Sequence, residues 1–469
     1  MSCTCEHCNH DFIAPMGALW QVYDGIGAKP DVVSVAWERE NGNVFRYDFP
    51  VAKRLSPDAA EYVAFVTERI AKFILWSAGG WKLYLAGPEA VVRPVANAYT
   101  KKGLRSFDYG FFNDLYGRPF EVEVLPLKKM PGAAEKTVKV KTVADGCRIG
   151  FDLGASDFKV SALDKGKVVF SKEFPWDPRN QDDPEYHYAK ITAGLKEAAA
   201  SLPRVDAIGC STAGTLVGKR LGPASLLRAV LERNPAKKDE ARNLFFRIEK
   251  DWGVPFEVFN DGDVTALAAA ITMNLKGVVG AAMGSSLAGG YVDQKGAMTG
   301  RISELAFAPV DFNPCAARDE WSGDFGVGAM YFSQQAVDRL AREYGFKFPK
   351  AMALPERLKV VQAAMEKGDA AALKVFVQIG RYLAHTVPWY GEFYDYSHLM
   401  ILGRVTSGLG GEIILETART MLKDVYPEWA EKIDILMPDE KARRLGQSVA
   451  AAQIPTIAKK AARAKKAAK

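Results

Sequence analysis

The chain has 469 residues, which is too many for one compact core, so two or three domains are expected. Hydrophobic residues make up 48% and charged residues 25%, as in an ordinary globular protein. The longest uncharged stretch, Gly277 to Val292, is too short and too rich in Gly and Ser to cross a membrane. The N-terminus lacks the basic start and apolar run of an export signal, so we expect a cytoplasmic protein.

The net charge of +6 is located at the C-terminal end. Six lysine and arginine side chains and no acidic residue lie in the last thirteen positions, so the rest of the chain is formally neutral. We treat 456–469 as a basic Ala/Lys tail. A neutral body with a basic tail lacks the charged face of a nucleic-acid-binding domain. We therefore expect no specific nucleic-acid partner and no membrane partner.

Three of the six cysteines lie near two histidines at the N-terminus: Cys3, Cys5 and Cys8. They form either a zinc site or a redox-exposed end, and a zinc ribbon needs a second pair of ligands that the sequence does not show. The other three are scattered singly and are expected to be reduced thiols: Cys147, Cys210 and Cys315.

The segment 1–130 is predicted to be a small α+β unit of unknown role. Strands are expected at Val32–Trp37, Trp81–Leu85 and Phe120–Leu125. Apolar residues have helical spacing over Ser56–Trp76, and Ser-Pro-Asp is its start signal. The following segment, 131–146, is rich in Lys with Pro and Gly and is predicted to be a linker.

From Cys147 onward, strands that end in glycine turns alternate with helices, which favours α/β architecture. Two hairpins in this region are similar, IGFDLGAS at 149–156 and VGAAMGSS at 279–286, and each is followed by a strand and an Asp-containing turn. The repetition predicts a duplicated domain with halves at 147–275 and 276–455, each offering one glycine turn to a shared cleft. Two unrelated hairpins would give the same pattern.

Both turns could hold a phosphate, because Gly, Ala and Ser let backbone N–H groups come close to it. The residues are Gly154, Ala155 and Ser156 in the first turn, and Gly284, Ser285 and Ser286 in the second. The sequence has no P-loop, and no GxGxxG opens a helix after a strand, which disfavours a classical NTPase or a dehydrogenase. Asp152 precedes the first turn and either holds Mg²⁺ through water or caps the turn.

A predicted strand, Phe256–Asn260, ends in Asn-Asp and is followed by a helix of small residues. Asn and Asp are good N-caps, so capping is one interpretation. In the other, Asn260 binds a sugar hydroxyl while Asp261 accepts its proton, as phosphoryl transfer to an alcohol requires. The position of this pair between the two glycine turns favours the second interpretation.

Taken in order, these motifs resemble the ROK family (repressors, open reading frames and kinases) of the actin/hexokinase superfamily. The motifs are DLGAS (152–156), VDAIGCSTAG (205–214), NDGDVTALAA (260–269), GSSLAGG (284–290), SEL (303–305) and MILGRV (400–405). The resemblance spans about residues 147 to 455. It implies duplicated actin-like ATPase (ribonuclease H-like) domains with an interdomain cleft, ATP and Mg²⁺ as cofactors, a sugar as substrate, and compatibility with a homodimer.

The resemblance also implies roles for individual residues. The two glycine turns would be phosphate loops, and Gly403 would lie by the adenosine. Asp261 would be the general base, and Asn260 and Glu304 would bind sugar hydroxyls. The sugar side of the cleft would be lined by Ser211, Thr212 and Gly214. A late apolar helix, with Gly446 and alanines at 450–452, resembles the closing helix of the family.

The sequence departs from the family at the sugar site. The sugar-contacting histidine of the family falls at Phe307, and its zinc motif would fall at 322–329, which has no cysteine, so no structural zinc is expected there. Asp324 is the candidate substitute sugar ligand, or else part of a solvated acidic loop.

The leading hypothesis is an ATP-dependent hexokinase-like enzyme. The alternatives are a sugar-sensing regulator or a sugar-binding homologue that has lost catalysis. A regulator would need an N-terminal helix-turn-helix with a basic recognition helix, and 11–130 does not read as one.

Overall fold

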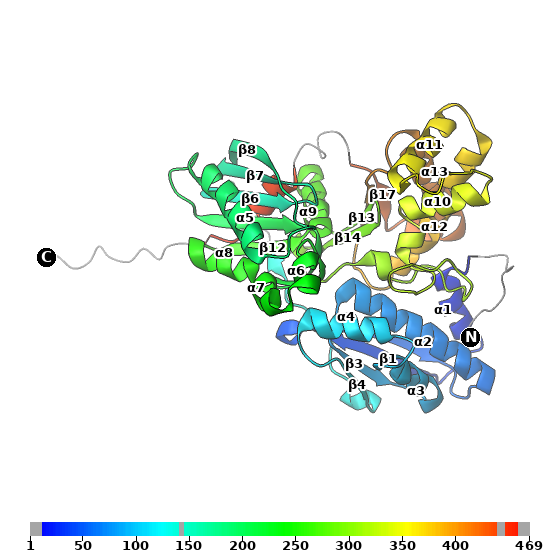
Figure 1. The fold of residues 1–469 in the computed structure, drawn as a ribbon. Coiled ribbons are helices and arrows are strands. Elements are labelled where there is room, and N and C mark those ends of the chain that lie inside the picture. Colours follow the sequence, from blue (N-terminus) through cyan, green and yellow to red (C-terminus); the bar gives the residue numbers. More distant parts are fainter. Residues whose placement is uncertain (1–11, 140–144, 439–445, 458–469) are drawn as a thin grey trace. The chain divides into compact units, whose positions relative to one another are not determined.

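The computed structural model describes residues 12–139, 145–438 and 446–457. The chain forms two compact units. The first comprises Met1–Val138 and Thr272–Arg443, and the second comprises Lys139–Ile271 and Arg444–Lys469. Each unit has its own central sheet, labelled in Figure 1. None of the helices in the described ranges combines the length and the apolar character that crossing a membrane requires.

The second unit is built on a five-stranded sheet in the order β12-β9-β6-β7-β8. β6, β9 and β12 are parallel to one another, whereas β7 is antiparallel to β6 and β8 is antiparallel to β7. β6 and β9 are almost entirely buried, as central strands covered on both faces should be. The strands are β6 (Cys147–Leu153), β7 (Asp157–Asp164), β8 (Lys167–Pro175), β9 (Ala207–Thr212) and β12 (Phe256–Asn260).

Different helices cover the two faces of this sheet, because successive side chains of a strand point to opposite faces. Ile149 of β6 belongs to a core with Ile191 and Phe245, on helices α5 and α8. Gly150 faces the other way, where a Cβ atom would lie 1.8 Å from the carbonyl oxygen of Ser448 on α16. The helices are α5 (Pro184–Ala199), α8 (Leu244–Trp252), α9 (Asp261–Met273) and α16 (Gln447–Ala452).

The first unit contains a six-stranded sheet in the order β17-β16-β13-β14-β15-β5. β13 is antiparallel to β14 and parallel to β16. The strands are β5 (Val138–Lys139), β13 (Val278–Met283), β14 (Leu287–Val292), β15 (Ala297–Met298), β16 (His398–Leu402) and β17 (Asp434–Leu436). The accompanying helices are α10 (Gln334–Glu343), α11 (Leu354–Glu366), α12 (Ala370–Gly391) and α13 (Leu409–Val425).

The two sheets have the same topology. In each, a hairpin of the first two strands is extended by a third antiparallel strand on one side and by two parallel strands on the other, so β6, β7, β8, β9 and β12 correspond to β13, β14, β15, β16 and β17. β5 is an additional strand at the edge of the six-stranded sheet. The two glycine turns occupy equivalent positions between the first and second strands. The predicted duplicated α/β fold is therefore confirmed.

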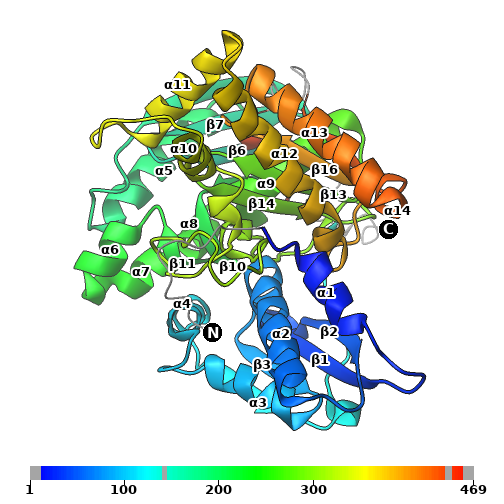
Figure 2. The ribbon, with the colours of Figure 1, turned by 90° about the vertical axis from the view of Figure 1, so that its right-hand side faces the viewer.

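The N-terminal part of the first unit is an α+β layer, as predicted (Figure 2). Its sheet has the order β2-β1-β3-β4, and the long helix α2 contacts β1 and β2. Its elements are α1 (Pro15–Tyr23), β1 (Asp31–Glu38), β2 (Val44–Val51), α2 (Pro57–Ala78), β3 (Lys82–Ala86), α3 (Glu89–Ala98), α4 (Ser106–Tyr116) and β4 (Glu121–Val124). The Ser56 side chain caps α2 by accepting the N–H of Ala59 at 3.2 Å.

Six buried charged side chains form an ion cluster in the first unit: Glu68, Arg69, Lys72, Arg105, Asp108 and Asp324. Arg105 binds Glu68 through two nitrogens and lies 2.7 Å from Asp324. Lys72 lies 3.0 Å from Asp108 and 3.1 Å from Asp324. Because three positive and three negative charges satisfy one another, the cluster can be buried. It fixes the loop around Asp324 onto helix α2.

Part of the segment predicted as a linker is held in place within the first unit. Ala134 forms a bridge with Val44. The carboxylate of Glu135 binds both Arg39 and Arg301, at 2.7 Å each. The remaining elements are η1 (Glu40–Gly42), η2 (Leu127–Lys129), β10 (Gly214–Val217), β11 (Arg220–Ser225), α6 (Arg228–Arg233), η3 (Pro235–Lys237), α7 (Lys238–Arg242), η4 (Leu305–Phe307), η5 (Gly328–Met330) and α14 (Pro427–Ala430).

Candidate functional site

Three parallel strands of the second unit end at the same edge of its sheet, and each end carries predicted site residues. Asp152 near the end of β6 is in register with Ser211 of β9. Thr212, the last residue of β9, is in register with Asn260, the last residue of β12. Since the carboxyl ends of parallel strands meet at one edge, the sheet brings together residues that are far apart in sequence.

Asp261 is the first residue of α9, directly after β12. Its carboxylate accepts the backbone N–H of Gly262 at 2.9 Å, and the side-chain oxygen of Asn260 accepts the same N–H at 2.7 Å. Asn260 also donates to the carbonyl of Gly214 at 2.9 Å. Helix capping, one of the two predicted interpretations, is therefore present, and these hydrogen bonds orient the side chains of Asn260 and Asp261.

Burial raises the pKa of Asp261 from 3.8 to about 6, although the backbone N–H groups of Asp261 and Gly262 oppose the shift. Burial likewise raises the pKa of Asp152 from 3.8 to about 6. The hydroxyl of Ser211 lowers it, and the charges of Asp261 and Asp157 raise it further. Because the charge of Asp261 acts on Asp152, the Asp261 carboxylate lies close enough to influence the ionisation of Asp152.

The first glycine turn, 154–156, joins β6 to β7. The N–H of Gly154 donates to the carbonyl of Asp157 at 3.0 Å, and the indole of Trp176 donates to the carbonyl of Gly154 at 2.9 Å. A Cβ atom at position 154 would lie 2.8 Å from the Asp157 carbonyl oxygen, so glycine is needed there. Ala155 and Ser156 are exposed at the tip.

The second glycine turn, 284–286, lies in the first unit between β13 and β14. Gly284 donates its N–H to the carbonyl of Ser286 and accepts the N–H of Gln334, both at 2.9 Å. Gly403 follows β16 with φ +102°, and a Cβ atom there would lie 2.5 Å from the carbonyl oxygen of Met283. The structure therefore brings Gly403 against the start of this turn. Ser285 and Ser286 are exposed.

The remaining predicted sugar ligands also lie in the first unit. Glu304 precedes η4, and its backbone N–H donates to the carbonyl of Trp76 at 2.9 Å. Phe307, three positions on, packs against the rings of Trp76 and Trp321, with ring centroids 4.7 and 5.0 Å apart. The prediction that Glu304 and Asp261 face a common cleft stays a prediction.

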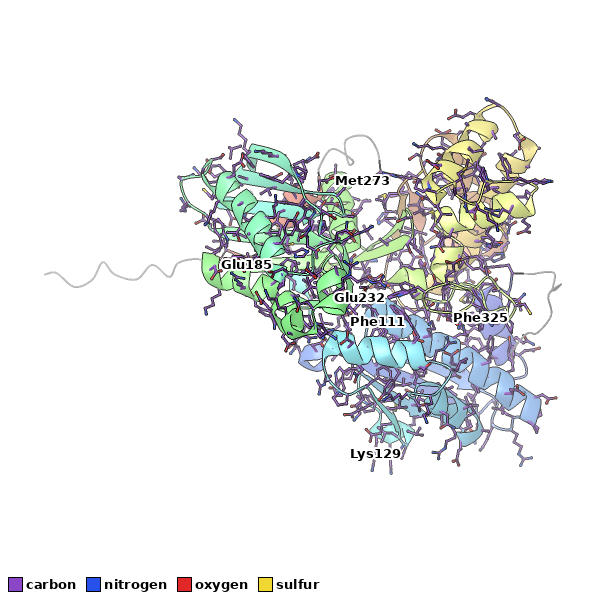
Figure 3. All side chains as sticks on the ribbon, in the orientation of Figure 1. Phe111, Lys129, Glu185, Glu232, Met273 and Phe325 are labelled. Carbon is purple, nitrogen blue, oxygen red and sulfur yellow. The ribbon has the colours of Figure 1, made fainter. Side chains whose placement is uncertain are left out.

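The structure contradicts the prediction for Asp324. Its carboxylate is almost completely buried and forms ion pairs with Arg69, Lys72 and Arg105. The charges of these cations hold its pKa well below 3.8, against the effect of burial. Arg69 also lies over the ring of Phe325, labelled in Figure 3, at 4.3 Å. A carboxylate committed to three cations is not available to a sugar hydroxyl, so Asp324 has a structural role.

Sequence reasoning missed two contacts at this site. Trp176 closes the first glycine turn, and Gln447 of α16 binds both the carbonyl of Asp261 and the hydroxyl of Thr265. Both partners are distant in sequence from the motifs, so no local pattern could reveal them. The late helix was predicted only by resemblance, and it was placed in the predicted half 276–455. In the structure it packs instead on β6, β7 and β9, the sheet of the second unit.

One prediction about the cysteines is wrong. Cys315 is disulfide-bonded, whereas Cys147 and Cys210 are free and buried as expected. No spacing signal in the sequence distinguished Cys315 from the other two. The N-terminal cysteines lie outside the described residues. Within the described ranges, no group of three or more His, Cys, Asp or Glu side chains is arranged to hold a metal ion.

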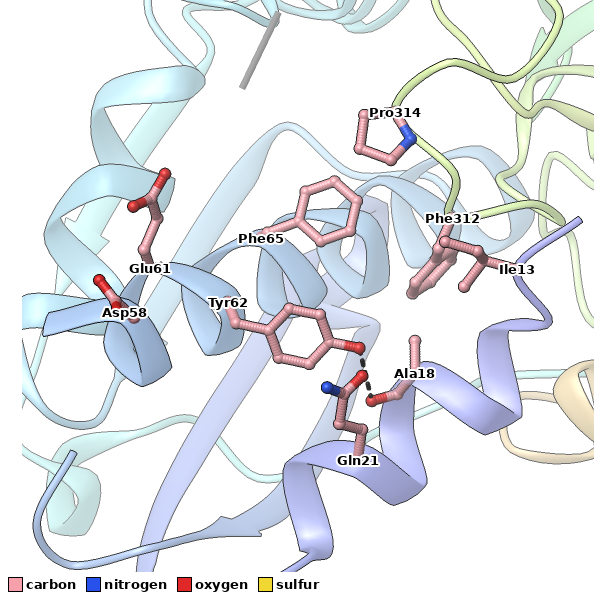
Figure 4. Close-up of a pocket in the computed structure, with 9 residues that line it drawn as sticks. All are labelled: Ile13, Ala18, Gln21, Asp58, Glu61, Tyr62, Phe65, Phe312 and Pro314. Atoms are coloured by element: carbon pink, nitrogen blue, oxygen red, sulfur yellow. Dashed lines mark hydrogen bonds between the residues drawn. The ribbon is translucent and has the colours of Figure 1, made fainter. Parts of the chain in front are cut away.

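A separate cavity of about 350 Å³ lies in the first unit among α1, α2 and the loop at 312–314 (Figure 4). Its walls are mostly apolar and include Tyr62, Phe65 and Phe312, with Asp58 and Glu61 near one end. The hydroxyl of Tyr62 donates to the carbonyl of Ala18 at 3.4 Å. None of the predicted site residues lines this cavity, so it is not part of the candidate site.

Comparisons with known proteins bear on the fold. The sequence matches no known family model and no curated protein. A ROK hexokinase from Thermus thermophilus is similar in structure, with a TM-score of 0.52 and 18% identity over 66% of this chain and 98% of that one. A ROK family transcriptional regulator, a homologue of the E. coli MLC protein, has a TM-score of 0.51 and 18% identity over 66% of this chain and 77% of that one. The chain therefore has the fold of the ROK proteins, as its motifs predicted.

Proposed function

We propose that the protein is an ATP-dependent kinase that phosphorylates a sugar hydroxyl, with Asp261 as the general base. The observation that carries the proposal is the pair of half-buried carboxylates, Asp152 and Asp261, at the shared edge of β6, β9 and β12. Paired carboxylates with raised pKa values at a strand edge are typical of a catalytic site. The duplicated sheet, with an equivalent glycine turn in each half, supports phosphate binding.

In the proposed reaction, Asp261 accepts the proton of the sugar hydroxyl while the sugar oxygen forms a bond to the γ-phosphorus of ATP. The bond from that phosphorus to the β,γ-bridging oxygen breaks, and ADP leaves. A pKa of about 6 suits this task, because the carboxylate is mostly ionised at neutral pH yet more basic than an exposed aspartate. The bonds of Asn260 and Gly262 keep Asp261 in one orientation.

Asp152 is the residue that would hold Mg²⁺, which would supply charge neutralisation on the phosphates when bound. Its surroundings fit a cation, because the charges of Asp261 and Asp157 disfavour its ionised form until a positive charge arrives. Magnesium keeps several of its waters, so it does not need a cage of three or more protein ligands. The exposed turn residues Ser156 and Ser285 would offer backbone N–H groups to phosphate oxygens.

The acceptor is proposed to be a sugar bound by Asn260, Glu304 and the end of β9, including Ser211, Thr212 and Gly214. With Asp324 committed to ion pairs and Phe307 packed among aromatic rings, two positions considered for sugar contacts offer no polar group. We therefore propose the class of substrate, a hexose or hexose derivative, without choosing among its members.

A DNA-binding regulator is the less favoured alternative. The helix α2 carries Arg69 and Lys72, but both are buried in ion pairs and cannot contact phosphates of DNA. A homologue that binds sugar without catalysis is also less favoured, because both glycine turns and the Asp152–Asp261 pair are present.

The test is a screen for ADP release with ATP, Mg²⁺ and a panel of hexoses, amino sugars and N-acetylated sugars, together with thermal-shift measurements of binding. We expect release that depends on one class of sugar. Asp261→Asn should abolish it while sugar binding persists, whereas Asp251→Asn, an exposed carboxylate on α8, should behave as wild type. Absence of sugar-dependent ADP release across the panel, with sugar binding detected, would favour the inactive homologue.

A further inference from the structure

The carbonyl of Asp261 is held by a side chain from the C-terminal end of the chain. Gln447, the first residue of α16, donates its amide nitrogen to this carbonyl at 3.2 Å and to the hydroxyl of Thr265 at 2.6 Å. Because a backbone carbonyl can only accept, it must be the nitrogen of the Gln447 amide that faces Asp261. The two N–H bonds of that nitrogen thus bridge positions i and i+4 of helix α9, across its first turn.

The helix that carries Gln447 lies directly on the sheet. A Cβ atom at Gly150 of β6 would lie 1.8 Å from the carbonyl oxygen of Ser448, and one at Gly209 of β9 would lie 1.8 Å from that of Ala451. The backbone of α16 therefore occupies the space that side chains of these two strands would otherwise fill. The hydroxyls of Ser448 and Ser161 on β7 are 2.9 Å apart, which adds a polar contact.

Further bonds fix the end of this segment to β6. The guanidinium of Arg148 donates to the carbonyl of Pro455 at 2.7 Å and to that of Ala452 at 3.3 Å. Arg148 and Gly150 lie on the same strand as Asp152, four and two residues before it, so all three side-chain positions are on one face of the sheet. The position of Gln447 is thus set by the strand that carries one carboxylate, while its amide holds the helix that carries the other.

We propose that Gln447 is a positioning residue, which fixes the start of α9, and so the Asp261 carboxylate, relative to Asp152. This inference rests on the proposed kinase function. A side chain that is held by its neighbours keeps a catalytic group in its productive geometry, and a displacement of about 1 Å can cost about 100-fold in rate. Gln447 does not touch the reacting atoms, so its effect passes through Asp261.

Substitutions at position 447 separate the hydrogen bonds from the charge. Gln447→Met removes both donors at similar length, and we expect kcat to fall about 10- to 100-fold with KM for sugar and ATP changed less than about 2-fold. Gln447→Glu places acceptors and a negative charge beside Asp261, so kcat falls and the acid limb of the pH profile moves to higher pH. Gln453→Met, at the other end of α16, is the matched control and should resemble wild type.

The pH profile must be interpreted with the charged groups around the pair. Asp157 and Lys159 from β7 act on Asp152, and so does the charge of Asp261. Gln447→Met changes none of these charges, so its acid limb should stay where it is in wild type. The shift in Gln447→Glu follows from its charge alone, so the readout that separates a positioning role from a merely structural one is the fall in kcat at unchanged KM in a Gln447→Met variant that melts like wild type.

A second residue keeps the inference testable if position 447 tolerates no change. Thr265→Val removes the other acceptor at constant shape and should also lower kcat at unchanged KM, and Thr265→Ser should recover most of the loss. Melting temperatures within a few degrees of wild type establish that the variants are folded. Wild-type kcat in folded Gln447→Met, or in Thr265→Val if the former does not fold, overturns the inference. Failure of wild type itself to transfer phosphate overturns the proposed function, and the inference with it.

Discussion

Replacing Asp261 by Asn should stabilise the second unit at neutral and alkaline pH. In the folded protein the pKa of Asp261 is about 6, compared with 3.8 as its ordinary value. Each pH unit between the two values is worth about 1.4 kcal/mol, so the ionised carboxylate costs the fold up to about 3 kcal/mol above pH 7. The asparagine removes the charge, and its side-chain oxygen can still accept the N–H of Gly262.

The sign of the pH dependence follows from the raised pKa. Below about pH 4, Asp261 is protonated in the folded and the unfolded chain alike, so the carboxyl costs nothing and the substitution gains nothing. As the pH rises through about 6, the folded state must give up a proton that it holds more tightly than the unfolded state does. The gain from Asp261→Asn should therefore appear between pH 4 and 7 and be complete above pH 7.

The assay is denaturant unfolding of wild type and Asp261→Asn at pH 4, 6 and 8. Because the chain has two compact units, the transition of each must be followed separately rather than as one two-state step. Asp251→Asn, an exposed carboxylate of the same unit, is the control and should show no comparable gain. A gain that is absent at pH 8, or equally large at pH 4, would refute the claim that burial raises the pKa of Asp261.

The rate of phosphoryl transfer should fall as the pH drops through about 6, because protonated Asp261 cannot accept the sugar proton. A pH profile of kcat checks this prediction, and a rate that is flat from pH 7.5 to 5 would contradict it. Gly403→Ala should raise KM for ATP about 10-fold or more, because its Cβ would displace the Met283 backbone beside the second glycine turn. Gly408→Ala is the comparison in ATP titrations: φ is also positive there, at +66°, but open space surrounds it, so it adds backbone strain without the clash. Asp324→Asn should destabilise the first unit by about 3–5 kcal/mol, since it leaves three buried cations short of a counter-charge; a melting temperature equal to that of the exposed-site variant Glu89→Gln would contradict this.

Much of the fold could be predicted from the sequence because its signals are local. The hairpins around Gly154 and Gly284 predicted the duplication, since each joins two apolar strands through a turn of small residues. The strand that ends at Asn260 and the helix that begins at Asp261 were equally clear, because capping residues mark the boundary. Parallel strands place their carboxyl ends at one edge, which is why Asp152 and Asp261 could be expected together.

The features that were missed depend on contacts between distant segments. Asp324 was predicted as a sugar ligand from its place in the chain. Its partners Arg69, Lys72 and Arg105 come from the N-terminal layer, and no motif in the sequence predicts how that layer packs. Gln447 contacts Asp261 across 186 positions, so no periodicity could link them. For the same reason, sequence spacing alone did not separate the disulfide-bonded Cys315 from the free thiols.

The most direct test of the central claim is to look for the product itself. Purified wild-type protein and the Asp261→Asn variant are incubated with ATP, Mg²⁺ and a mixture of hexoses and hexose derivatives, and the mixture is analysed by mass spectrometry. We expect a sugar monophosphate and an equal amount of ADP with wild type, and neither with the variant. Equal yields of phosphosugar from both proteins would contradict the role of Asp261, and ADP without any phosphosugar would contradict a sugar as the acceptor.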